Sequence, residues 1–504
     1  MNNEKVSSAV AVIGMACRYP GASDLKTFWE NILSRRRQFR TFPDQRFPLS
    51  DYYDPDPSAP DKTYGNKAAF IDGFQFDWIG HRIPKSTVRT ADIAHWLALD
   101  VALQALADAG HSAQTVPRER SGVILGNTLT GEQSRSEGLR LRWPFVCRAL
   151  RASAKARGVS PQVTDEVART MEAYYKSVFA EVTEDTLSGS LSNTIAGRIC
   201  NYLDLHGGGY TVDGACSSGL ISVATAASAL INRDLDLALA GGVDISLDTF
   251  ELIGFAKVGA LTRTDMYVYD RRGSGFIPGE GCGFVVLKRL DDAIRDGNDV
   301  YAVIRGWGIS SDGKGGLTAP SVTGQAIALR RAYQRAGLDP RELAFIEGHG
   351  TGTTVGDRVE LEAIATVLGE AGPVRDRSCG ITSLKSIIGH TKAASGIGGF
   401  IKAVIAANRR VLPPTANCTE PNEIFEASAR SLYPVVRGEV RASTESLKAG
   451  VSSMGFGGIN CHITIESGDE PSPKLSPSES RLFGLGDVLG NVFEHEQRIR
   501  CHRR

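Results

Sequence analysis

Residues 212–220 read Val-Asp-Gly-Ala-Cys-Ser-Ser-Gly-Leu and place a single cysteine between a predicted strand and a predicted helix. The strand is indicated by residues 210–212, Tyr-Thr-Val, which follow a turn of three glycines at 207–209. The helix is indicated by residues 217–232, whose composition is apolar around the whole circumference, so we expect it to be buried on all sides. The stretch therefore predicts a strand, a turn and a buried helix, with Cys216 at the junction.

The position of Cys216 allows two interpretations. At the start of a helix, the positive end of the helix dipole favours the thiolate form of a cysteine. The thiolate is the form that attacks a carbonyl carbon. A lone cysteine in apolar surroundings is, however, usually a packing residue of the core. This segment alone leaves both interpretations open.

Two histidines each follow a short apolar strand pattern and stand in a glycine-rich turn. His349 lies within Phe-Ile-Glu-Gly-His-Gly-Thr-Gly-Thr-Thr-Val-Gly-Asp (345–357). His390 ends Ser-Leu-Lys-Ser-Ile-Ile-Gly-His (383–390), which also contains Lys385. Loop histidines are mostly solvated or bonded to a nearby carbonyl group, so neither motif alone establishes a function. Together with the cysteine they supply a nucleophile, two acid–base or hydrogen-bond-donating groups and a cation.

Three of these motifs occur in a fixed order: Asp-Gly-Ala-Cys-Ser-Ser, Glu-Gly-His-Gly-Thr-Gly-Thr and Lys-Ser-x-x-Gly-His. A fourth, Ser452–His462, follows near the end, and Val10–Gly21 opens the set. In this combination the chain resembles the β-ketoacyl synthases of polyketide and fatty-acid assembly, over residues 8–466. Short peptides at 59–64, 268–270 and 278–283 are most similar to iterative type I polyketide synthases of the enediyne and polyunsaturated-fatty-acid-like kind.

The resemblance implies an α/β, thiolase-like fold, with two similar halves in a five-layered αβαβα arrangement. We expect residues 1–290 to form the N-terminal half with the nucleophile. Residues 291–466 should form the C-terminal half with the two histidines, the lysine and a glycine-rich loop. Residues 467–504 have the composition of a Pro/Ser-rich linker with a short tail. No internal repeat is evident by residue identity.

The resemblance also implies a reaction, the decarboxylative Claisen condensation of an acyl group with a malonyl thioester. The chain would then be an acyltransferase of the β-ketoacyl-[acyl-carrier-protein] synthase type. Cys216 would take the acyl group from a carrier. His349 and His390 would stabilise the enolate formed when the malonyl group loses carbon dioxide. Lys385 would fix a histidine and set the local potential.

The same scheme assigns roles to the glycine-rich loop. The backbone N–H groups of Cys216 and Phe456 would hold the oxyanion formed during acyl transfer. Gly455 and Gly457 would let the second amide approach the site. The Phe456 side chain, by family likeness, would gate access between the two half-reactions.

Two alternative functions remain. A coenzyme A thiolase has a second catalytic cysteine near its C-terminus, and Cys461 lies close to the expected place. A non-catalytic, ketosynthase-like partner subunit usually lacks the nucleophile, whereas Cys216 is present here. Starter unit, chain length and product are not readable from the sequence.

Composition excludes several classes of partner. Lys and Arg together number 57, as do Asp and Glu, so the zero net charge gives no general reason to expect nucleic acid or a membrane as partner. The nine cysteines are dispersed without a Cys-x-x-Cys pair, which argues against zinc and fits a reducing cytoplasm. We expect no bound cofactor, because the substrates are carried on phosphopantetheine.

The expected partners follow from the family: an acyl carrier protein, acyltransferase and reductase partners in trans or in a longer synthase, and a second copy in a homodimer. One local charge excess is notable, because residues 135–157 are rich in arginine and lysine. A solvated helix face and a patch for an acidic carrier protein both explain it.

Overall fold

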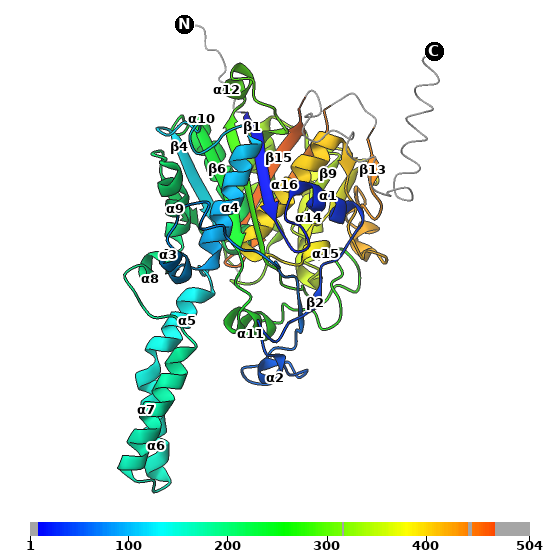
Figure 1. Ribbon diagram of the computed structural model, residues 1–504. Helices are drawn as coiled ribbons and strands as arrows, with labels where there is room; N and C mark the ends of the chain where they lie inside the picture. Colours follow the sequence, from blue (N-terminus) through cyan, green and yellow to red (C-terminus); the bar gives the residue numbers. More distant parts are fainter. Residues whose placement is uncertain (1–8, 315–316, 442–445, 469–504) are drawn as a thin grey trace.

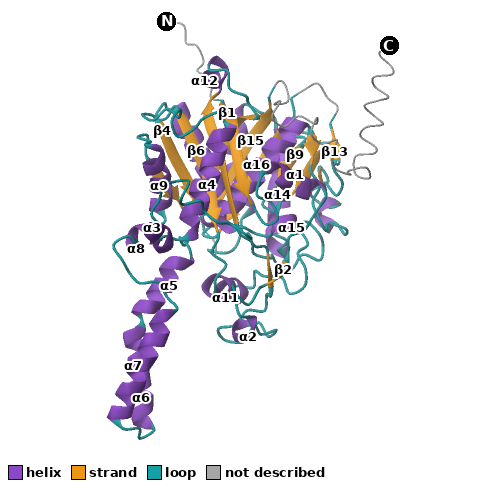
Figure 2. Cartoon of the chain, in the orientation of Figure 1, coloured by secondary structure: helices purple, strands orange, loops and turns teal. Residues whose placement is uncertain are grey.

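The computed structural model describes residues 9–314, 317–441 and 446–468. Its central feature is an eleven-stranded mixed sheet with strand order β12-β10-β9-β14-β15-β8-β1-β7-β6-β4-β5 (Figures 1 and 2). The strands are β1 (Val10–Arg18), β4 (Ser121–Gly126), β5 (Gly209–Val212), β6 (Leu237–Asp244), β7 (Gly281–Arg289), β8 (Ala302–Ser311), β9 (Phe345–Glu347), β10 (Cys379–Thr382), β12 (Leu432–Pro434), β14 (Lys448–Gly455) and β15 (Ile459–Ser467).

The sheet contains a duplication that residue identity does not reveal. The strands β1-β7-β6-β4-β5 pair antiparallel, antiparallel, parallel, parallel in that order. The strands β8-β15-β14-β9-β10 repeat the same sequence of pairings. The two sets meet where β1 pairs antiparallel with β8. The structure therefore contains the two similar halves that the resemblance implied, joined into one continuous sheet.

Helices form three layers around the two sheet halves. The middle layer consists of α10 (Ser218–Ile231) and α16 (Ser395–Arg409), which share one core with strands of both halves. On the first half, α4 (Ile93–Asp108) and α9 (Asn193–Leu203) cover the outer face. On the second half, α13 (Val322–Ala336) and α14 (Thr354–Glu370) do the same. This is the expected five-layered arrangement.

The sequence patterns explain the buried elements. Helix α10 buries ten of its fourteen residues and exposes none fully, in line with its apolar composition. Helix α4 begins directly after Asp92, whose side chain accepts a hydrogen bond from the N–H of Ala94 and so caps the helix.

A helical hairpin projects from this body (Figure 1). It consists of α5 (Glu132–Leu141), α6 (Trp143–Ala156) and α7 (Pro161–Ser177). Near its base, the rings of Trp143 and Tyr175 lie 5.5 Å apart and hold α6 against α7. The arginine- and lysine-rich residues 135–157 thus lie on an arm rather than in the layered body.

Smaller elements complete the described chain. They are α1 (Leu25–Leu33), α2 (Leu49–Tyr52), α3 (Lys85–Thr90), α8 (Thr186–Ser190), α11 (Thr249–Lys257), α12 (Leu290–Arg295), α15 (Lys385–Ile388), β2 (Arg40–Thr41), β3 (Lys67–Ala68), β11 (Val411–Leu412) and β13 (Glu439–Val440). None of the helices in the described ranges is long and apolar enough to cross a membrane. The predicted linker and tail after Glu466 lie almost entirely outside the described residues.

Candidate active site

Cys216 and His390 occupy equivalent places in the two halves. Cys216 lies in a 3₁₀ turn (Ala215–Ser217) between β5 and α10. The loop of His390 leads from β10 into a second 3₁₀ turn (Lys392–Ala394) and then into α16. Because β5 and β10 occupy matching positions in the duplicated sheet, the two turns approach each other at the ends of the middle helices.

The turn that carries Cys216 is held by contacts from the second half of the chain. The carbonyl oxygen of Cys216 accepts hydrogen bonds from the hydroxyls of Ser395 at 3.2 Å and Ser453 at 3.0 Å. Ala215, directly before the cysteine, has a φ of 49°, a left-handed conformation that is rare for alanine. Strain of this kind persists where surrounding structure imposes it, and it is common at functional sites.

The glycine-rich loop reaches the cysteine as predicted. The turn between β14 and β15 places the backbone N–H of Phe456 close enough to the Cys216 thiol to lower its pKa. A side chain at Gly455 would overlap the carbonyl oxygen of Gly214, so this close approach requires glycine. Gly457 has a φ of 93°, which also favours glycine. The Phe456 ring is partly exposed and faces the ring of Phe255 at 6.4 Å.

His349 is oriented as a hydrogen-bond donor. Its ring Nδ1 accepts a hydrogen bond from the N–H of Met454 at 3.2 Å. Since Nδ1 is the acceptor, the neutral ring carries its proton on Nε2. Burial and the nearby charge of Lys385 lower the pKa of His349 well below its usual value, which keeps the ring neutral.

His390 lies beside His349, with the two ring centroids 5.4 Å apart and the rings nearly perpendicular. It is buried, packs edge-on against Phe276, and its pKa is also well below the usual value, first because of burial and then because of Lys385 and Lys392. Two neutral imidazoles are thus adjacent in one buried site. Neutral imidazoles are suited to donating hydrogen bonds to a developing oxyanion.

Lys385 connects these groups electrostatically. Its buried ammonium group lowers the pKa of Cys216, His349 and His390. Burial lowers the pKa of Lys385 itself, although the carboxylates of Glu347 and Glu360 oppose that shift. The structure therefore brings together all four residues that the sequence singled out.

Burial dominates the electrostatics of the Cys216 thiol. The helix end was expected to favour the thiolate, whereas burial raises the pKa of the thiol to about 11. Lys385 and the N–H of Phe456 lower it, but desolvation is the larger effect. The helix position could be inferred locally, whereas the desolvation comes from elements distant in sequence that cover the thiol.

A pH dependence follows from this direction. Because the pKa of Cys216 lies near 11, the thiolate fraction should rise about tenfold per pH unit between pH 7 and pH 9. The rate of Cys216 alkylation by iodoacetamide should rise in parallel, measured by peptide mass spectrometry. The Cys216→Ala variant supplies the background from other cysteines. A rate that is already constant from pH 7 upward would contradict the raised pKa.

Two carboxylates that sequence reasoning missed shape the His349 loop. Glu360, on α14, accepts hydrogen bonds from the N–H groups of His349 and Gly350, and from the hydroxyl of Tyr269 at 3.0 Å. Asp357 accepts from the N–H groups of Thr351 and Gly352. Asp357 ends the quoted motif, and Glu360 follows it by three residues, which on a helix indicates the same face.

Lys392, which the sequence analysis did not single out, is a fully buried anchor of the His390 loop. Its ammonium group lies 2.6 Å from carboxylate oxygens of both Asp244 and Glu251 and donates to the carbonyl of Ser246. Its φ of 47° mirrors that of Ala215 in the other half. Lys392 therefore ties the loop to β6 and α11.

Removing this cation should destabilise the protein. Lys392→Met leaves two buried carboxylates without their partner, and breaking such a pair typically costs about 3–5 kcal/mol. Urea unfolding followed by circular dichroism measures the change. Adding Asp244→Asn and Glu251→Gln removes the unpaired charges and should restore most of the lost stability. An unchanged unfolding midpoint for Lys392→Met would contradict the anchoring role.

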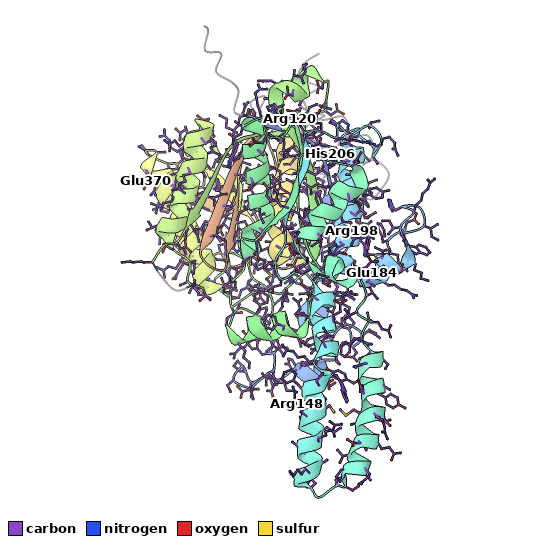
Figure 3. The ribbon with its side chains drawn as sticks, turned by 90° about the vertical axis from the view of Figure 1, so that its left-hand side faces the viewer. Arg120, Arg148, Glu184, Arg198, His206 and Glu370 are labelled. Carbon is purple, nitrogen blue, oxygen red and sulfur yellow. The ribbon has the colours of Figure 1, made fainter. Side chains whose placement is uncertain are left out.

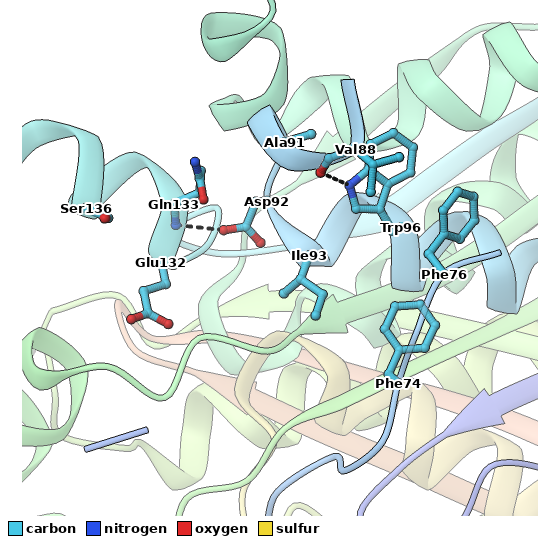
Figure 4. A pocket seen from close by; sticks show the side chains of 10 residues that line it. All are labelled: Phe74, Phe76, Val88, Ala91, Asp92, Ile93, Trp96, Glu132, Gln133 and Ser136. Carbon is cyan, nitrogen blue, oxygen red and sulfur yellow. Dashed lines mark hydrogen bonds between the residues drawn. The ribbon is translucent and has the colours of Figure 1, made fainter. Parts of the chain in front are cut away.

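A cavity of about 400 Å³ lies apart from these residues, at the base of the hairpin (Figure 4). Figure 4 shows Asp92 accepting a hydrogen bond from the N–H of Gln133, which joins α4 to α5 across the cavity. None of the four predicted catalytic residues lines it. In the described part of the chain, no group of three or more histidine, cysteine or acidic residues is arranged to hold a metal ion.

Comparison with family profiles shows which protein family the chain belongs to. Residues 7–293 match the profile described as "Beta-ketoacyl synthase, N-terminal domain", and residues 301–419 match "Beta-ketoacyl synthase, C-terminal domain". The chain belongs to the β-ketoacyl synthase family. This confirms the family resemblance, and with it the class of condensing acyltransferases.

Curated relatives of this ketosynthase domain are much longer proteins. Polyketide synthase PksL of Bacillus subtilis is 35% identical over 92% of the chain, which spans 9% of that protein. A polyunsaturated fatty acid synthase of Thraustochytrium has a subunit that is 34% identical over 93% of the chain, which spans 17% of it. The relatives thus include the polyunsaturated-fatty-acid kind that the short peptides indicated, together with other polyketide synthases.

Solved structures agree with the fold. The ketosynthase from module 6 of the bacillaene synthase of Bacillus subtilis 168 is 34% identical, with a TM-score of 0.76, covering 91% of this chain and 72% of that one. An oxazolomycin ketosynthase domain of Streptomyces albus is 27% identical, with a TM-score of 0.78, covering 92% and 74%. Ketosynthase domains of the thiolase-like fold are therefore close structural neighbours over nearly the whole chain.

Proposed function

We propose that this domain condenses an acyl group, held as a thioester on Cys216, with malonyl-carrier protein. The observation that carries the proposal is the single buried site in which the Cys216 thiol, the N–H of Phe456 and the paired rings of His349 and His390 meet around the charge of Lys385. The product is a β-ketoacyl-carrier of polyketide or fatty-acid-like biosynthesis.

In the first half-reaction, the sulfur of Cys216 attacks the carbonyl of an acyl-carrier thioester. The oxyanion forms beside the N–H of Phe456, which lies near the sulfur, and beside the N–H of the cysteine itself. The carrier thiolate leaves and takes up the proton that the Cys216 thiol gave up. Because that thiol is protonated at neutral pH, the proton is available within the site.

In the second half-reaction, the malonyl thioester loses carbon dioxide and forms an enolate. The neutral rings of His349 and His390 donate hydrogen bonds to its oxygen; one such aligned donor is worth about 3–4 kcal/mol. The enolate carbon attacks the acyl-Cys216 carbonyl, the C–S bond breaks, and the cysteine thiolate takes up one proton from solvent, which balances the loss of the malonyl carboxylate as carbon dioxide.

The proposed partners follow from the same chemistry. Both substrates are carried on the phosphopantetheine arm of a carrier protein, and acyltransferase and reductase partners act in trans or in a longer synthase. β5 is an edge strand of the sheet, and its Tyr210 is exposed. An edge strand can pair with the same strand of a second copy, which supports a homodimer. Unpaired, mostly buried cysteines fit a cytoplasmic location.

Release of carbon dioxide tests the function against its main alternative. The purified chain, given malonyl-carrier and an acyl donor, should release carbon dioxide and form β-ketoacyl-carrier, detected by intact mass. A thiolase would instead cleave or form acetoacetyl-coenzyme A without decarboxylation. Cys461, the second cysteine of that alternative, is buried in the core around the middle helices, and burial raises its pKa well above the usual range.

A further inference from the structure

The ammonium group of Lys392 is held by two elements of the first half. It lies 2.6 Å from carboxylate oxygens of Asp244, at the end of β6, and of Glu251, on α11. It also donates a hydrogen bond to the carbonyl oxygen of Ser246 at 2.9 Å. An ammonium group has three N–H donors, so three oxygens at these distances match its full capacity. The side chain therefore fixes its own backbone relative to β6 and α11.

The backbone at this lysine has a strained conformation. Lys392 begins its 3₁₀ turn with a φ of 47°, in the left-handed region that residues other than glycine rarely adopt. The next N–H group, of Ala393, donates a hydrogen bond to the second carboxylate oxygen of Asp244 at 3.4 Å. Such strain persists where surrounding groups impose it. The carboxylate of Asp244 thus holds both the lysine side chain and the following amide in the strained turn.

The strained turn packs directly against the turn that carries Cys216. A β-carbon at Gly219, in the first turn of α10, would lie 2.7 Å from the carbonyl oxygen of Ala393. A β-carbon at Gly242 of β6 would lie 2.9 Å from the same oxygen. Glycine at both positions gives this carbonyl group the space it occupies. Ser395, directly after the turn, donates to the carbonyl oxygen of Cys216. The position of the Lys392 turn therefore determines the position of the nucleophile.

The same turn begins two residues after His390. The backbone of His390 is fixed on its other side, because its N–H donates to the carbonyl of Ile277 at 2.8 Å and its carbonyl accepts from the N–H of Gly279 at 3.0 Å. Only Thr391 separates these hydrogen bonds from the contacts of Lys392. The lysine is thus the second fixed point of the short loop that carries the His390 ring.

Charge adds to this mechanical connection. Lys385 and Lys392 both lower the pKa of His390, which favours the neutral ring that donates a hydrogen bond. The charged and titratable groups that face His390 or Lys392 come from separate segments; they are Asp244, Glu251, Glu280, His349 and Lys385. Each of these acidic groups also has a cationic partner, so the cluster is balanced.

We propose that Lys392 is a positioning residue for the condensation. Held by β6 and α11, it fixes the turn between His390 and α16 and thereby aligns the nucleophile with the enolate donor. The proposal rests on the proposed function, because the two residues that it aligns act in the two half-reactions. A purely structural role makes a different prediction, since activity would then return whenever stability returns.

A charge-neutralised variant separates positioning from stability. It combines Lys392→Met with Asp244→Asn and Glu251→Gln, so that neither carboxylate is left without its lysine partner. Stability is measured by urea unfolding. Carbon dioxide release from malonyl-carrier is measured between pH 5 and pH 8 in the Cys216→Gln background, where acylation cannot contribute. Hydrogen exchange is followed by mass spectrometry in the peptide 214–220, which contains none of these three substitutions and is examined with Cys216 intact.

The matched control neutralises a comparable cluster away from the site. Arg289 is also a buried cation between two carboxylates, those of Asp236 and Asp292. It donates to the carbonyl of Leu230, at the end of α10 opposite to Cys216. The control variant therefore combines Arg289→Met, Asp236→Asn and Asp292→Asn.

The Lys392 triple variant should unfold near the wild-type urea midpoint yet release carbon dioxide about 10- to 100-fold more slowly, the scale expected for a small misplacement of reacting groups. Exchange in the peptide 214–220 should be faster, because the Cys216 turn loses its support. Without the charge of Lys392 the pKa of His390 rises, so the loss of rate on acidification should begin at a higher pH. The control variant should keep the wild-type rate, exchange and pH profile.

Several results would overturn the positioning role. Wild-type rate and exchange in the Lys392 triple variant would do so, as would an unchanged pH profile or an equal slowing in the Arg289 control. A rate that falls only in proportion to the folded fraction would reduce Lys392 to a stabilising residue. Failure of the proposed function is distinguishable, because the wild type would then release no carbon dioxide. Exchange in the peptide 214–220 would still report whether Lys392 supports the Cys216 turn.

Discussion

Replacing Cys216 with alanine should abolish covalent acylation and condensation while the protein stays folded. The thiol is the nucleophile of the proposed scheme, and the substitution removes only one sulfur atom from a site that must in any case admit a substrate. Intact-mass spectrometry after incubation with acyl-carrier should show no adduct, and β-ketoacyl-carrier should fall to the background of the assay. This is the largest effect we expect from any single substitution.

Cys461→Ala is the matched control, since Cys461 is also a buried cysteine in the core around α10 and α16. It should retain acylation and condensation. Cys216→Gln, whose amide resembles the acyl thioester carbonyl, should lose condensation but keep malonyl decarboxylation. A stable acyl adduct on another cysteine in Cys216→Ala would show that the nucleophile lies elsewhere, and loss of activity in Cys461→Ala would favour the thiolase alternative.

The second large effect concerns the histidines. His349→Ala and His390→Ala should each slow carbon dioxide release by about 10²–10³, the typical consequence of removing one oxyanion donor. Acylation of Cys216 should remain measurable, because both rings are neutral donors assigned to the enolate rather than bases for the thiol. Single-turnover acylation and decarboxylation of malonyl-carrier separate the two steps.

His206→Ala is the control for the histidine variants, because His206 is exposed and lies at the far end of the molecule from the hairpin (Figure 3). It should leave both steps unchanged. If the His349 and His390 variants lose acylation completely but decarboxylate normally in the Cys216→Gln background, the two rings serve the first half-reaction instead. The role assigned to the enolate would then be wrong.

The active-site loops are anchored by residues that lie outside the motifs around Cys216, His349 and His390. Glu360 binds two backbone N–H groups of the His349 loop, and Lys392 binds two carboxylates beneath the His390 loop. Both side chains are buried and charged. Each therefore needs hydrogen-bonding or oppositely charged groups, which folding brings next to it.

Local patterns along the chain determined much of this protein. The apolar composition of residues 217–232 specifies a buried helix, and the three glycines before Tyr210 specify the turn that precedes the strand. Asp92 specifies where α4 begins, because its side chain satisfies an N–H group of the first turn. The ordered motifs around Cys216, His349 and His390 specify the family. All of these signals act over a few residues, through helical periodicity, turn geometry and capping.

Tertiary structure alone decided how these pieces work together. The duplication is visible only in the strand pairing. The order of pairing in β1-β7-β6-β4-β5 recurs in β8-β15-β14-β9-β10, whereas the residues of the two sets differ. Cys216 meets the N–H of Phe456 from 240 positions later in the chain only after the halves close. Its pKa is raised because that closure removes water from the thiol, which outweighs the local helix end. Desolvation depends on every segment that covers a group, and no local pattern in the sequence encodes that sum.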